Sequence, residues 1–283
     1  MGVWLIYFFV FLFGLVVGSF LNCVIYRLAL PNFSLKNLGG LKGRSFCPLC
    51  KHELAWQDLI PVFSFIFLRG KCRYCREKIS LQYPLVELAA GIIFLLVFLP
   101  WCNEFTPVNL LSLWYFWIIS CFLIVIFVYD LKHYIIPDKI IYPAIIIAGI
   151  FNLQFLISEE GSAPFFTFAP INGSSVFNYS ILAAILVAAF FLAIVLISRG
   201  KWMGIGDIKL AFLMGLFLGW PNILVALFSA FFIGAIIGVG LVLSGKKTLK
   251  SEVPFGPFLV TGTFIALFWG QEIIDRYLNL FLL

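Results

Sequence analysis

Residues 178–198 read NYSILAAILVAAFFLAIVLIS, and this stretch decides the class of fold. It contains no charged side chain, and its length matches the about 20 apolar residues that a helix needs to cross a ~30 Å hydrocarbon layer. Its apolar residues are continuous, whereas the strands of a membrane β-barrel alternate apolar and polar positions. The stretch therefore predicts a transmembrane helix.

Apolar stretches of the same kind lie on both sides of it along the chain. The composition agrees, because 63% of the 283 residues are hydrophobic and only 11% are charged, against about 25% charged in an ordinary soluble domain. The sequence predicts an all-α polytopic membrane bundle of about eight transmembrane helices and excludes a large soluble domain. Besides 178–198, the expected spans are 3–26, 84–100, 108–129, 138–157, 206–220, 222–244 and 256–282.

The positions of the basic residues predict the orientation of these spans. Of the 19 Lys and Arg residues, all but Arg276 lie in four loops, at 27–83, 130–139, 199–209 and 245–255. These loops fall on one side of the membrane, and the positive-inside rule makes that side cytoplasmic. We therefore expect an inner-membrane protein with both termini external. Because the basic residues gather in loops on one side, we interpret the net charge of +6 as a consequence of membrane topology, and we expect no nucleic-acid partner.

The first span is expected to stay as a membrane anchor. It lacks the basic n-region of a secretory signal, and its first basic residue, Arg27, comes after the apolar run. Gly14, Gly18 and Asn22 recur every four residues, so they share one stripe of the helix where a second helix can approach closely. Packing is the favoured role of the two glycines, and Asn22 is expected to be hydrogen-bonded inside the bundle.

Residues 27–83 form the one sizeable polar segment. It is too short to bury enough apolar surface to fold alone, so a stabilising cross-link such as a disulfide or a bound metal is expected. Cys47-Pro-Leu-Cys50 and Cys72-Arg-Tyr-Cys75 supply two Cys-x-x-Cys pairs, which together predict a closed, structural four-thiolate zinc site. Disulfides are disfavoured by a reducing compartment. A redox dithiol is disfavoured because two pairs are present and no βαβ pattern surrounds them. We divide the chain into a first helix (1–26), a zinc-binding loop (27–83) and a helical bundle (84–283).

Four acidic residues lie at or near membrane depth, where a carboxylate is costly: Glu87, Asp130, Asp138 and Asp207. Asp130 closes the third span and Asp207 opens the sixth, so the predicted topology places both at the cytoplasmic boundary. Two adjacent carboxylates share one proton, as in aspartic proteases. One takes a proton from a water that attacks the scissile carbonyl, and the other donates its proton to the carbonyl oxygen.

The two glycines beside Asp207 have an expected role, and the acidic residues also have structural interpretations. Gly204 and Gly206 are expected to let an unwound backbone approach an extended substrate peptide. Asp207 also suits a purely structural role at a helix N-terminus, where the dipole favours an acid. Asp138 suits such a role better, because Pro137 precedes it. Glu87 is read mainly as a structural acid that faces the bundle.

Taken together, these motifs resemble the type IV prepilin peptidases, which belong to the Gly-x-Gly-Asp intramembrane aspartyl proteases. The resemblance covers nearly the whole chain, and the order and spacing of the motifs agree. It rests on Gly18-Ser19-Phe20-Leu21-Asn22, Ile25-Tyr26-Arg27, the two Cys-x-x-Cys pairs, Leu68-Arg69-Gly70-Lys71-Cys72, Tyr83-Pro84-Leu85-Val86-Glu87-Leu88, the segment from Asp130 to Asp138, Gly204-x-Gly206-Asp207-x-Lys209-Leu210 and Pro254-Phe255-Gly256-Pro257-Phe258.

The resemblance implies an enzyme that removes the leader peptide of type IV prepilins or type II secretion pseudopilins at the cytoplasmic face. It also implies N-methylation of the new terminus with S-adenosyl-L-methionine, because the zinc loop marks the bifunctional members. Catalysis is assigned by resemblance to Asp130 and Asp207. The supporting residues are then Gly204, Gly206, Asp138 and Lys209, and the candidates for cofactor binding are Glu87 and Asp58.

One motif departs from the family pattern, and two other classes of function are kept as alternatives. Where the family reads an acid followed by Asn-Ile-Pro, this chain has Asp58-Leu59-Ile60-Pro61, so the amide is absent. The first alternative is a non-catalytic, zinc-stabilised membrane assembly subunit of a pilus or secretion system. The second is a proton-coupled transporter, which is disfavoured because no inverted repeat is visible and both Asp residues lie at one boundary. The expected partners are prepilin or pseudopilin substrates and membrane lipid.

Overall fold

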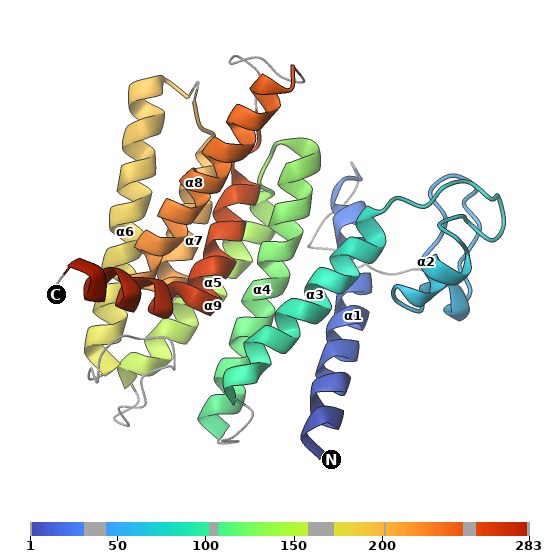
Figure 1. The fold of residues 1–283 in the computed structure, drawn as a ribbon, viewed down its shortest axis with the longest axis horizontal. Helices are drawn as coiled ribbons and strands as arrows, with labels where there is room; N and C mark the ends of the chain where they lie inside the picture. Colours follow the sequence, from blue (N-terminus) through green and yellow to red (C-terminus); the bar gives the residue numbers. More distant parts are fainter. Residues whose placement is uncertain are drawn as a thin grey trace. The chain divides into compact units, whose positions relative to one another are not determined.

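The computed structural model describes residues 2–30, 44–101, 107–157, 173–200, 202–245 and 253–281. Within these residues the chain is helical, and its only β-structure is two isolated bridges in the cysteine loop. Each of the predicted apolar ranges contains a helix (Figure 1). These helices are α1 (Gly2–Leu28), α3 (Gln82–Phe98), α4 (Pro107–His133), α5 (Asp138–Ile157), α6 (Gly173–Ser198), α7 (Ile205–Leu218), α8 (Asn222–Leu243) and α9 (Gly256–Phe281).

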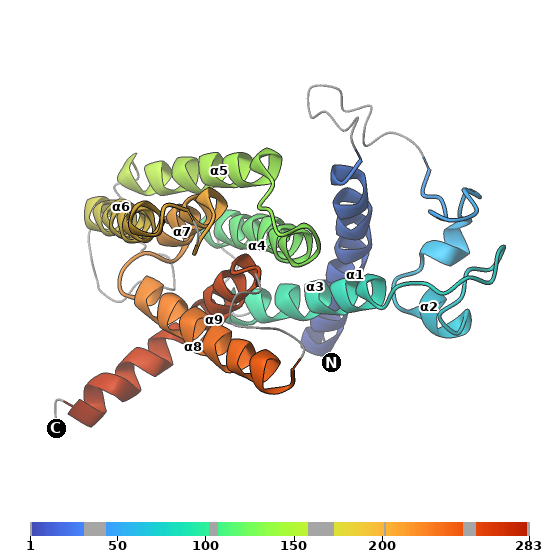
Figure 2. The same cartoon turned by 90° about the horizontal axis from the view of Figure 1, so that it is seen from above.

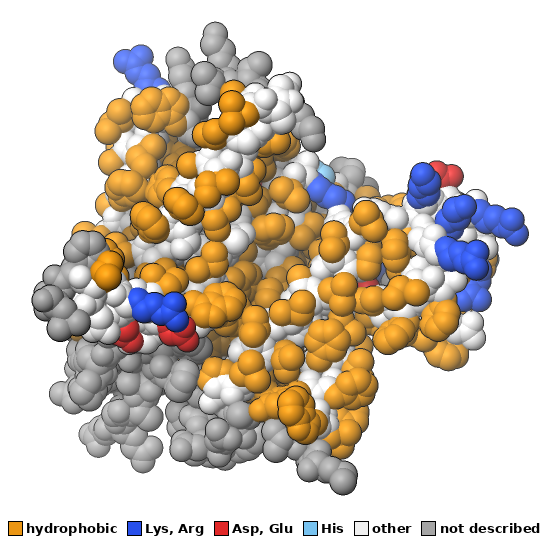
Figure 3. All heavy atoms as spheres, in the orientation of Figure 1, with side chains coloured by type: hydrophobic (Ala, Val, Ile, Leu, Met, Phe, Trp, Pro, Cys, Tyr) orange, Lys and Arg blue, Asp and Glu red, His pale blue; other side chains and the backbone are white. Residues whose placement is uncertain are grey.

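The all-helical membrane architecture predicted from the sequence is confirmed. Among the described residues, α1, α4, α6, α8 and α9 are long and apolar enough to cross a membrane, and α3 is a shorter apolar helix. Hydrophobic side chains dominate the face of the helices that Figure 3 shows, as expected where lipid, not water, is the surrounding solvent. The count of about eight crossings remains a prediction.

The chain forms two compact units, Met1–Val125 and Ile126–Leu283, and the boundary between them falls inside α4. In the first unit, α1 packs along α3. A Cβ atom on Gly14 would lie 2.8 Å from Gly91 Cα, and one on Gly18 would lie 2.7 Å from Glu87 Cα. The glycine stripe is therefore what allows the two backbones to approach, as predicted.

The polar end of the same stripe is also satisfied inside the first unit. Asn22 donates a hydrogen bond to the carbonyl oxygen of Tyr83 (3.0 Å) and accepts one from Gln82 Nε2 (3.3 Å). Farther along α3, the indole of Trp117 donates to the carbonyl of Phe94 (3.1 Å), and the two rings stack with centroids 5.0 Å apart. These contacts satisfy polar groups that would be costly in lipid.

The second unit is built around α7. This helix lies between α5 and α6 on one side and α8 and α9 on the other (Figure 2), and it is apolar all round, which is typical of a buried helix. It ends before Gly219, whose φ of 65° suits a helix C-cap. Its 14 residues span only about 21 Å at 1.5 Å per residue. One end of α7 therefore stops short of a full membrane crossing, and Asp207 lies in its first turn.

Candidate active site

Asp130 lies inside the last turn of α4. The helix continues to His133, beyond the predicted end of the third span at 129, so this carboxylate sits on a rigid element and not at a frayed end. Asp130 is buried and accepts a hydrogen bond from the backbone N–H of Gly256, the first residue of α9. A Cβ at position 256 would overlap the Asp130 carboxylate, so only glycine fits this contact.

Asp207 lies in the first turn of α7 and is also buried. Its Oδ2 accepts a hydrogen bond from the backbone N–H of Gly204 at 3.2 Å, and Gly204 itself has an extended backbone (φ −83°, ψ 157°). Asp207 therefore satisfies one of the free N–H groups at the start of its own helix. This is the structural role that the sequence left open, and it also fixes the direction of the carboxylate.

The second unit brings Asp130 and Asp207 close enough to interact electrostatically. Among the described residues, neither carboxylate forms an ion pair with a Lys or Arg. Two neighbouring buried carboxylates without a cationic partner are the arrangement in which one proton can be shared between two acids. The arrangement is therefore chemically able to take and to give a proton at one place.

Gly206 differs from the expectation of an unwound backbone. It lies within α7 and is helical, and a Cβ there would come within 3.1 Å of Ile136 Cβ. The glycine is thus used for close packing of α7 against the segment between α4 and α5. Only Gly204 has the extended conformation that was expected for both.

Asp138 and Lys209 form an ion pair with each other. Asp138 begins α5, and its Oδ1 lies 2.5 Å from Lys209 Nζ, which also stands 4.8 Å from the centroid of the Tyr142 ring. The Asp138 side chain is 61% exposed, in contrast to the buried pair. The ion pair links the first turns of α5 and α7 and thereby holds the segment that carries Asp207.

Four cysteine sulfurs gather in the first unit. The Sγ atoms of Cys47, Cys50, Cys72 and Cys75 all lie within 4.8 Å of one another, and Cys47 and Cys75 are 4.0 Å apart. A tetrahedral zinc with Zn–S bonds of about 2.3 Å needs sulfurs about 3.8 Å apart, so the four residues fit this metal. The predicted four-thiolate cluster is thus confirmed as a group of ligands that could hold an ion.

The two Cys-x-x-Cys pairs use the same local fold. The carbonyl of Cys47 accepts a hydrogen bond from Lys51 N–H (2.8 Å), and the carbonyl of Cys72 accepts one from Arg76 N–H (2.9 Å). Lys51 and Arg76 have φ values of 57° and 58°. Burial raises the pKa of Cys47, but hydrogen bonds from the backbone of Cys50 and Leu49 and from the side chains of Cys50 and Cys72 lower it to about 7. The pKa of Cys75 in the same cluster is instead raised to about 11, so Cys47 is the thiol that loses its proton more readily of the two.

Glu87 joins three parts of the first unit. It is buried, its Oε2 accepts a hydrogen bond from Val62 N–H at 2.7 Å, and the Ser19 side chain of α1 hydrogen-bonds to it as well. Val62 has a φ of 61°, which is strained for a β-branched residue. The carboxylate thus fixes an unusual turn of the cysteine loop against α3 and α1.

Asp58 has a comparable role inside the loop. Its carboxylate accepts hydrogen bonds from Arg73 Nε (2.7 Å), Tyr74 Oη (3.3 Å) and the Ala55 backbone N–H (3.2 Å). Its side chain is only 3% exposed. Asp58 therefore ties the segment between the two cysteine pairs to the second pair.

The sequence alone assigns no role to Gly256 or Val62. Gly256 belongs to the Pro-Phe-Gly-Pro-Phe motif, and a glycine flanked by bulky residues at the start of a span is the signal that could have indicated a close approach. No signal in the sequence pointed to the contact of Val62 with Glu87.

Two sequence models of protein families match the chain. The first, described as the bacterial Peptidase A24 N-terminal domain, matches residues 12–101, which include the four cysteines and Glu87. The second, described as the type IV leader peptidase family, matches residues 117–239, which include Asp130 and Asp207.

Curated proteins match over almost their full length. The chain is 31% identical to a protein of Aeromonas hydrophila over 302 residues, with 99% of this chain and 96% of the relative covered. It is 30% identical to a protein of Bacillus subtilis (strain 168), with 95% and 97% covered, and 32% identical to one of Legionella pneumophila, with 98% and 96% covered. All three relatives carry the name prepilin leader peptidase/N-methyltransferase. No solved structure matches the chain.

Proposed function

The chain belongs to the type IV leader peptidase family, and from this premise we propose that it hydrolyses the leader peptide of prepilins with Asp130 and Asp207. The observation that carries the assignment of the two residues is their pairing as buried carboxylates that interact electrostatically. The names of its relatives join peptidase and N-methyltransferase, and the enzyme accordingly has both activities. Type II secretion pseudopilins are a second class of substrate in this proposal.

The hydrolysis follows the chemistry of a shared proton. The ionised carboxylate of the pair takes a proton from a water, and the oxygen of this water attacks the carbonyl carbon of the scissile peptide bond. The protonated carboxyl donates its proton to the carbonyl oxygen. As the tetrahedral intermediate collapses, the carboxyl that took the proton from water gives it to the leaving nitrogen and the C–N bond breaks. One hydroxyl of the intermediate returns its proton to the other carboxylate, which restores the pair. The backbone N–H groups of Gly204 and Gly256 hold the two carboxylates in place during these steps.

Supporting roles follow from the contacts around the pair. Gly204 and Gly206 let the first turn of α7 adopt its position, and the Asp138–Lys209 ion pair anchors that turn to α5. None of these residues exchanges protons with the substrate in this proposal. They position Asp207.

The protein is a multi-pass membrane protein, and we propose that its basic loops face the cytoplasm. The loops at 27–83, 130–139, 199–209 and 245–255 contain all Lys and Arg residues except Arg276, and two of them, 130–139 and 199–209, carry the aspartates. This orientation leaves both termini external and places the active site at the cytoplasmic face of the inner membrane. It also places the cysteines in a reducing compartment, which supports zinc over disulfides.

The cysteine cluster is proposed to hold one structural Zn²⁺. We keep the division of the chain into 1–26, 27–83 and 84–283, with the zinc-binding loop as the methyltransferase region. Glu87 and Asp58 are the candidate residues for the methyl donor, since the buried charge of Glu87 complements a sulfonium cation. S-adenosyl-L-methionine supplies the methyl group when it is bound. Through the Val62 hydrogen bond, Glu87 holds the loop in position for that reaction.

The test is co-expression with a prepilin followed by measurement of the intact mass of the pilin. Wild-type enzyme is expected to remove the leader and add one methyl group, and the two changes separate by mass. Asp207→Asn is expected to leave the prepilin uncut, whereas Asp275→Asn, which alters an exposed acid of α9, is expected to cut normally. A pilin that keeps its leader in the presence of wild-type enzyme would contradict the proposed activity.

A further inference from the structure

The part of the cysteine loop that the structure describes between α1 and α3, residues 44–81, is called the cysteine module below. One end of the module exposes large apolar side chains. They come from the short turn η2 (Trp56–Leu59) and the short helix α2 (Phe63–Phe67), neither of which has a buried residue. Phe67 is 82% exposed and Trp56 is 73% exposed. We call this surface the apolar end, and it consists of Trp56, Leu59, Phe63, Ile66 and Phe67.

The hydrogen bond from Val62 N–H to Glu87 locates the apolar end relative to α3. Val62 directly precedes α2, and Glu87 lies five residues after the start of α3 at Gln82. Five residues of helix correspond to about 7.5 Å. The turn before α2 therefore lies beside the body of α3, and Figure 1 shows α2 beside α1 and not beyond its end. Because α1 and α3 are apolar helices of the kind that lie in lipid, we infer that the turn before α2 lies near the level at which lipid surrounds them.

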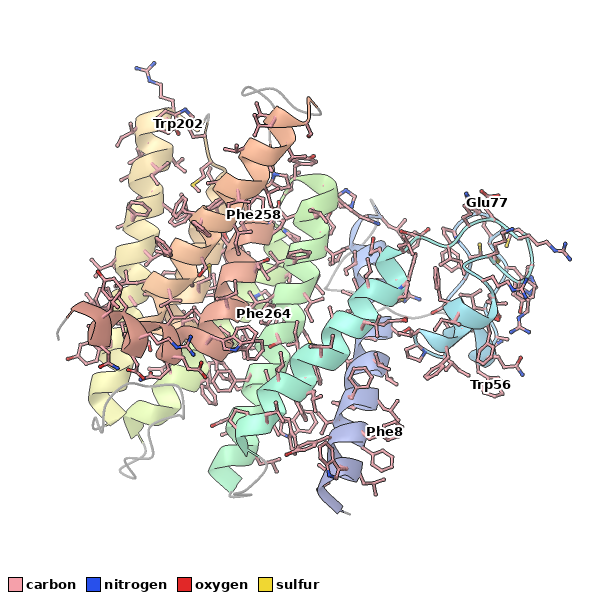
Figure 4. All side chains as sticks on the ribbon, in the orientation of Figure 1. Phe8, Trp56, Glu77, Trp202, Phe258 and Phe264 are labelled. Atoms are coloured by element: carbon pink, nitrogen blue, oxygen red, sulfur yellow. The ribbon has the colours of Figure 1, made fainter. Side chains whose placement is uncertain are left out.

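The other surface of the module is basic. Figure 4 shows Trp56 and Glu77 at opposite ends of the module, and Figure 3 shows Lys and Arg gathered away from its hydrophobic side. Residues 44–81 contain seven Lys and Arg against three Asp and Glu. Two ion pairs of the module join Arg44 to Glu53 and Arg73 to Asp58. Within the described residues, no acidic side chain pairs with the remaining basic residues, Lys51, Arg69, Lys71, Arg76 and Lys78.

We propose that the cysteine module is a lipid-binding element, in which the apolar end inserts into the interfacial layer of the adjacent leaflet and the unpaired basic residues attract anionic phospholipid headgroups. Trp and Phe on one face with Lys and Arg on the rest are the side chains that segments lying in a membrane interface use. Arg69 lies two residues after the end of α2, and Arg73 is bonded to Asp58 of η2, so both lie near the apolar end. The inference goes beyond the peptidase and methyltransferase activities and depends only on α1 and α3 lying in the membrane.

The five basic residues without an acidic partner make an anionic lipid surface the occupant that complements the charge of the module. Anionic headgroups have the opposite charge, and a juxtamembrane basic cluster binds them within a Debye length of the surface.

Photo-crosslinking from the apolar end tests the proposal on the zinc-loaded full chain. The variant Phe67→p-benzoylphenylalanine places an aromatic cross-linker at the apolar end, and Glu77→p-benzoylphenylalanine is the matched control at the opposite end. Each protein is reconstituted in vesicles of phosphatidylcholine, with or without phosphatidylglycerol, and adducts are counted by intact mass after irradiation. Zinc content and protease resistance show that both variants keep the fold.

We expect a several-fold higher yield of lipid adduct at position 67 than at position 77. Phosphatidylglycerol is expected to raise the yield at position 67, and added salt is expected to reduce this gain. Equal adduct yields at the two positions would overturn the insertion. A yield that does not respond to phosphatidylglycerol would overturn the role of the basic residues. A prepilin adduct at position 67, with no lipid adduct when prepilin is absent, would show a substrate-docking surface in its place.

Discussion

Asp130 accepts a hydrogen bond from the backbone N–H of Gly256, and a Cβ atom on that glycine would overlap the carboxylate. Asp207 is held in the same manner by the N–H of Gly204. At the scale of single residues, the geometry of the pair therefore depends on two glycines as well as on two acids. Burial makes this dependence strong, because leaving a buried acceptor without its hydrogen bond is costly.

We predict that Gly256→Ala lowers leader cleavage by about 10²-fold, because a shift of about 1 Å in a reacting group costs that much. The added methyl group must displace Asp130 or the start of α9. The matched control is Gly238→Ala, at a position of α8 where a Cβ meets nothing within 4 Å. The cleavage rate of both purified variants checks this. Equal, near-normal rates would show that Asp130 is not where the chemistry occurs.

A second prediction at this scale concerns the Asp138–Lys209 ion pair. Because the pair is partly exposed, its loss costs at most about 1 kcal/mol, so Asp138→Asn should reduce cleavage by less than about tenfold. The exchanged variant Asp138→Lys with Lys209→Asp should recover most of the lost rate. A loss as complete as that of Asp207→Asn would instead make Asp138 a member of the catalytic group.

The sequence alone proposes Asp130 and Asp207 as a pair, but it does not predict their contacts. A carboxylate at membrane depth is energetically costly, so it is expected to have a function. The topology inferred from the Lys and Arg residues predicts that Asp130 and Asp207 lie at the same boundary. The contact of Asp130 with Gly256 joins residues far apart in the chain, and nothing local in either segment specifies it. Asp138 and Lys209 are also far apart in the chain, so their ion pair likewise depends on the tertiary fold.

At the scale of elements, the apolar runs predicted the helices to within a few residues, because a helix in lipid must satisfy its own backbone and be apolar throughout. The largest difference near the site is the extra turn of α4, which runs to His133. The polar residues of this turn ended the apolar run at 129, but they do not break a helix. The cysteine pairs predicted their cluster correctly, since Cys-x-x-Cys turns are local structures. The apolar end of the module was not predicted, because exposure depends on the tertiary fold.

The prediction at the scale of elements concerns zinc binding by the cysteine module. Purified protein is expected to carry one zinc per chain, and the double variant Cys47→Ser, Cys72→Ser is expected to lose it. Both residues are buried in the cluster. The binding energy of a structural metal is folding energy in so small a module, so residues 44–81 should become sensitive to protease. Metal analysis and limited proteolysis measure the two effects.

The matched control for the zinc prediction is Cys23→Ser with Cys121→Ser. These two cysteines lie outside the cluster, so the control should keep both its zinc and its resistance. A preparation without metal whose module remains resistant would remove the structural role of zinc.

At the scale of the whole molecule, the two proposed sites belong to different parts of the chain. The aspartate pair belongs to the unit Ile126–Leu283, and the cysteine module with Glu87 belongs to the unit Met1–Val125. Methyl transfer to a neutral amine depends mainly on proximity and orientation, so it does not need the aspartate pair. The enzyme should therefore lose its two activities separately.

We predict that the zinc-free double variant loses methylation more than cleavage. Conversely, Asp207→Asn should stop cleavage and still methylate a pilin that is supplied already cleaved. The mass of the pilin recovered from each variant distinguishes leader removal from methylation. Proportional loss of both activities in every module variant would point to one shared site or to misfolding.

The central claim is that Asp130 and Asp207 act as one unit, and the most direct measurement is the cleavage rate of a purified prepilin by three variants. Asp130→Asn, Asp207→Asn and the double variant are each expected to lose about 10³-fold or more, because residues that act as a unit are not additive. Asn keeps the size of the side chain but cannot exchange the proton, and zinc content serves as the check on folding. A single variant that cuts at a near-normal rate, or losses in the two single variants that multiply in the double, would contradict the shared-proton mechanism.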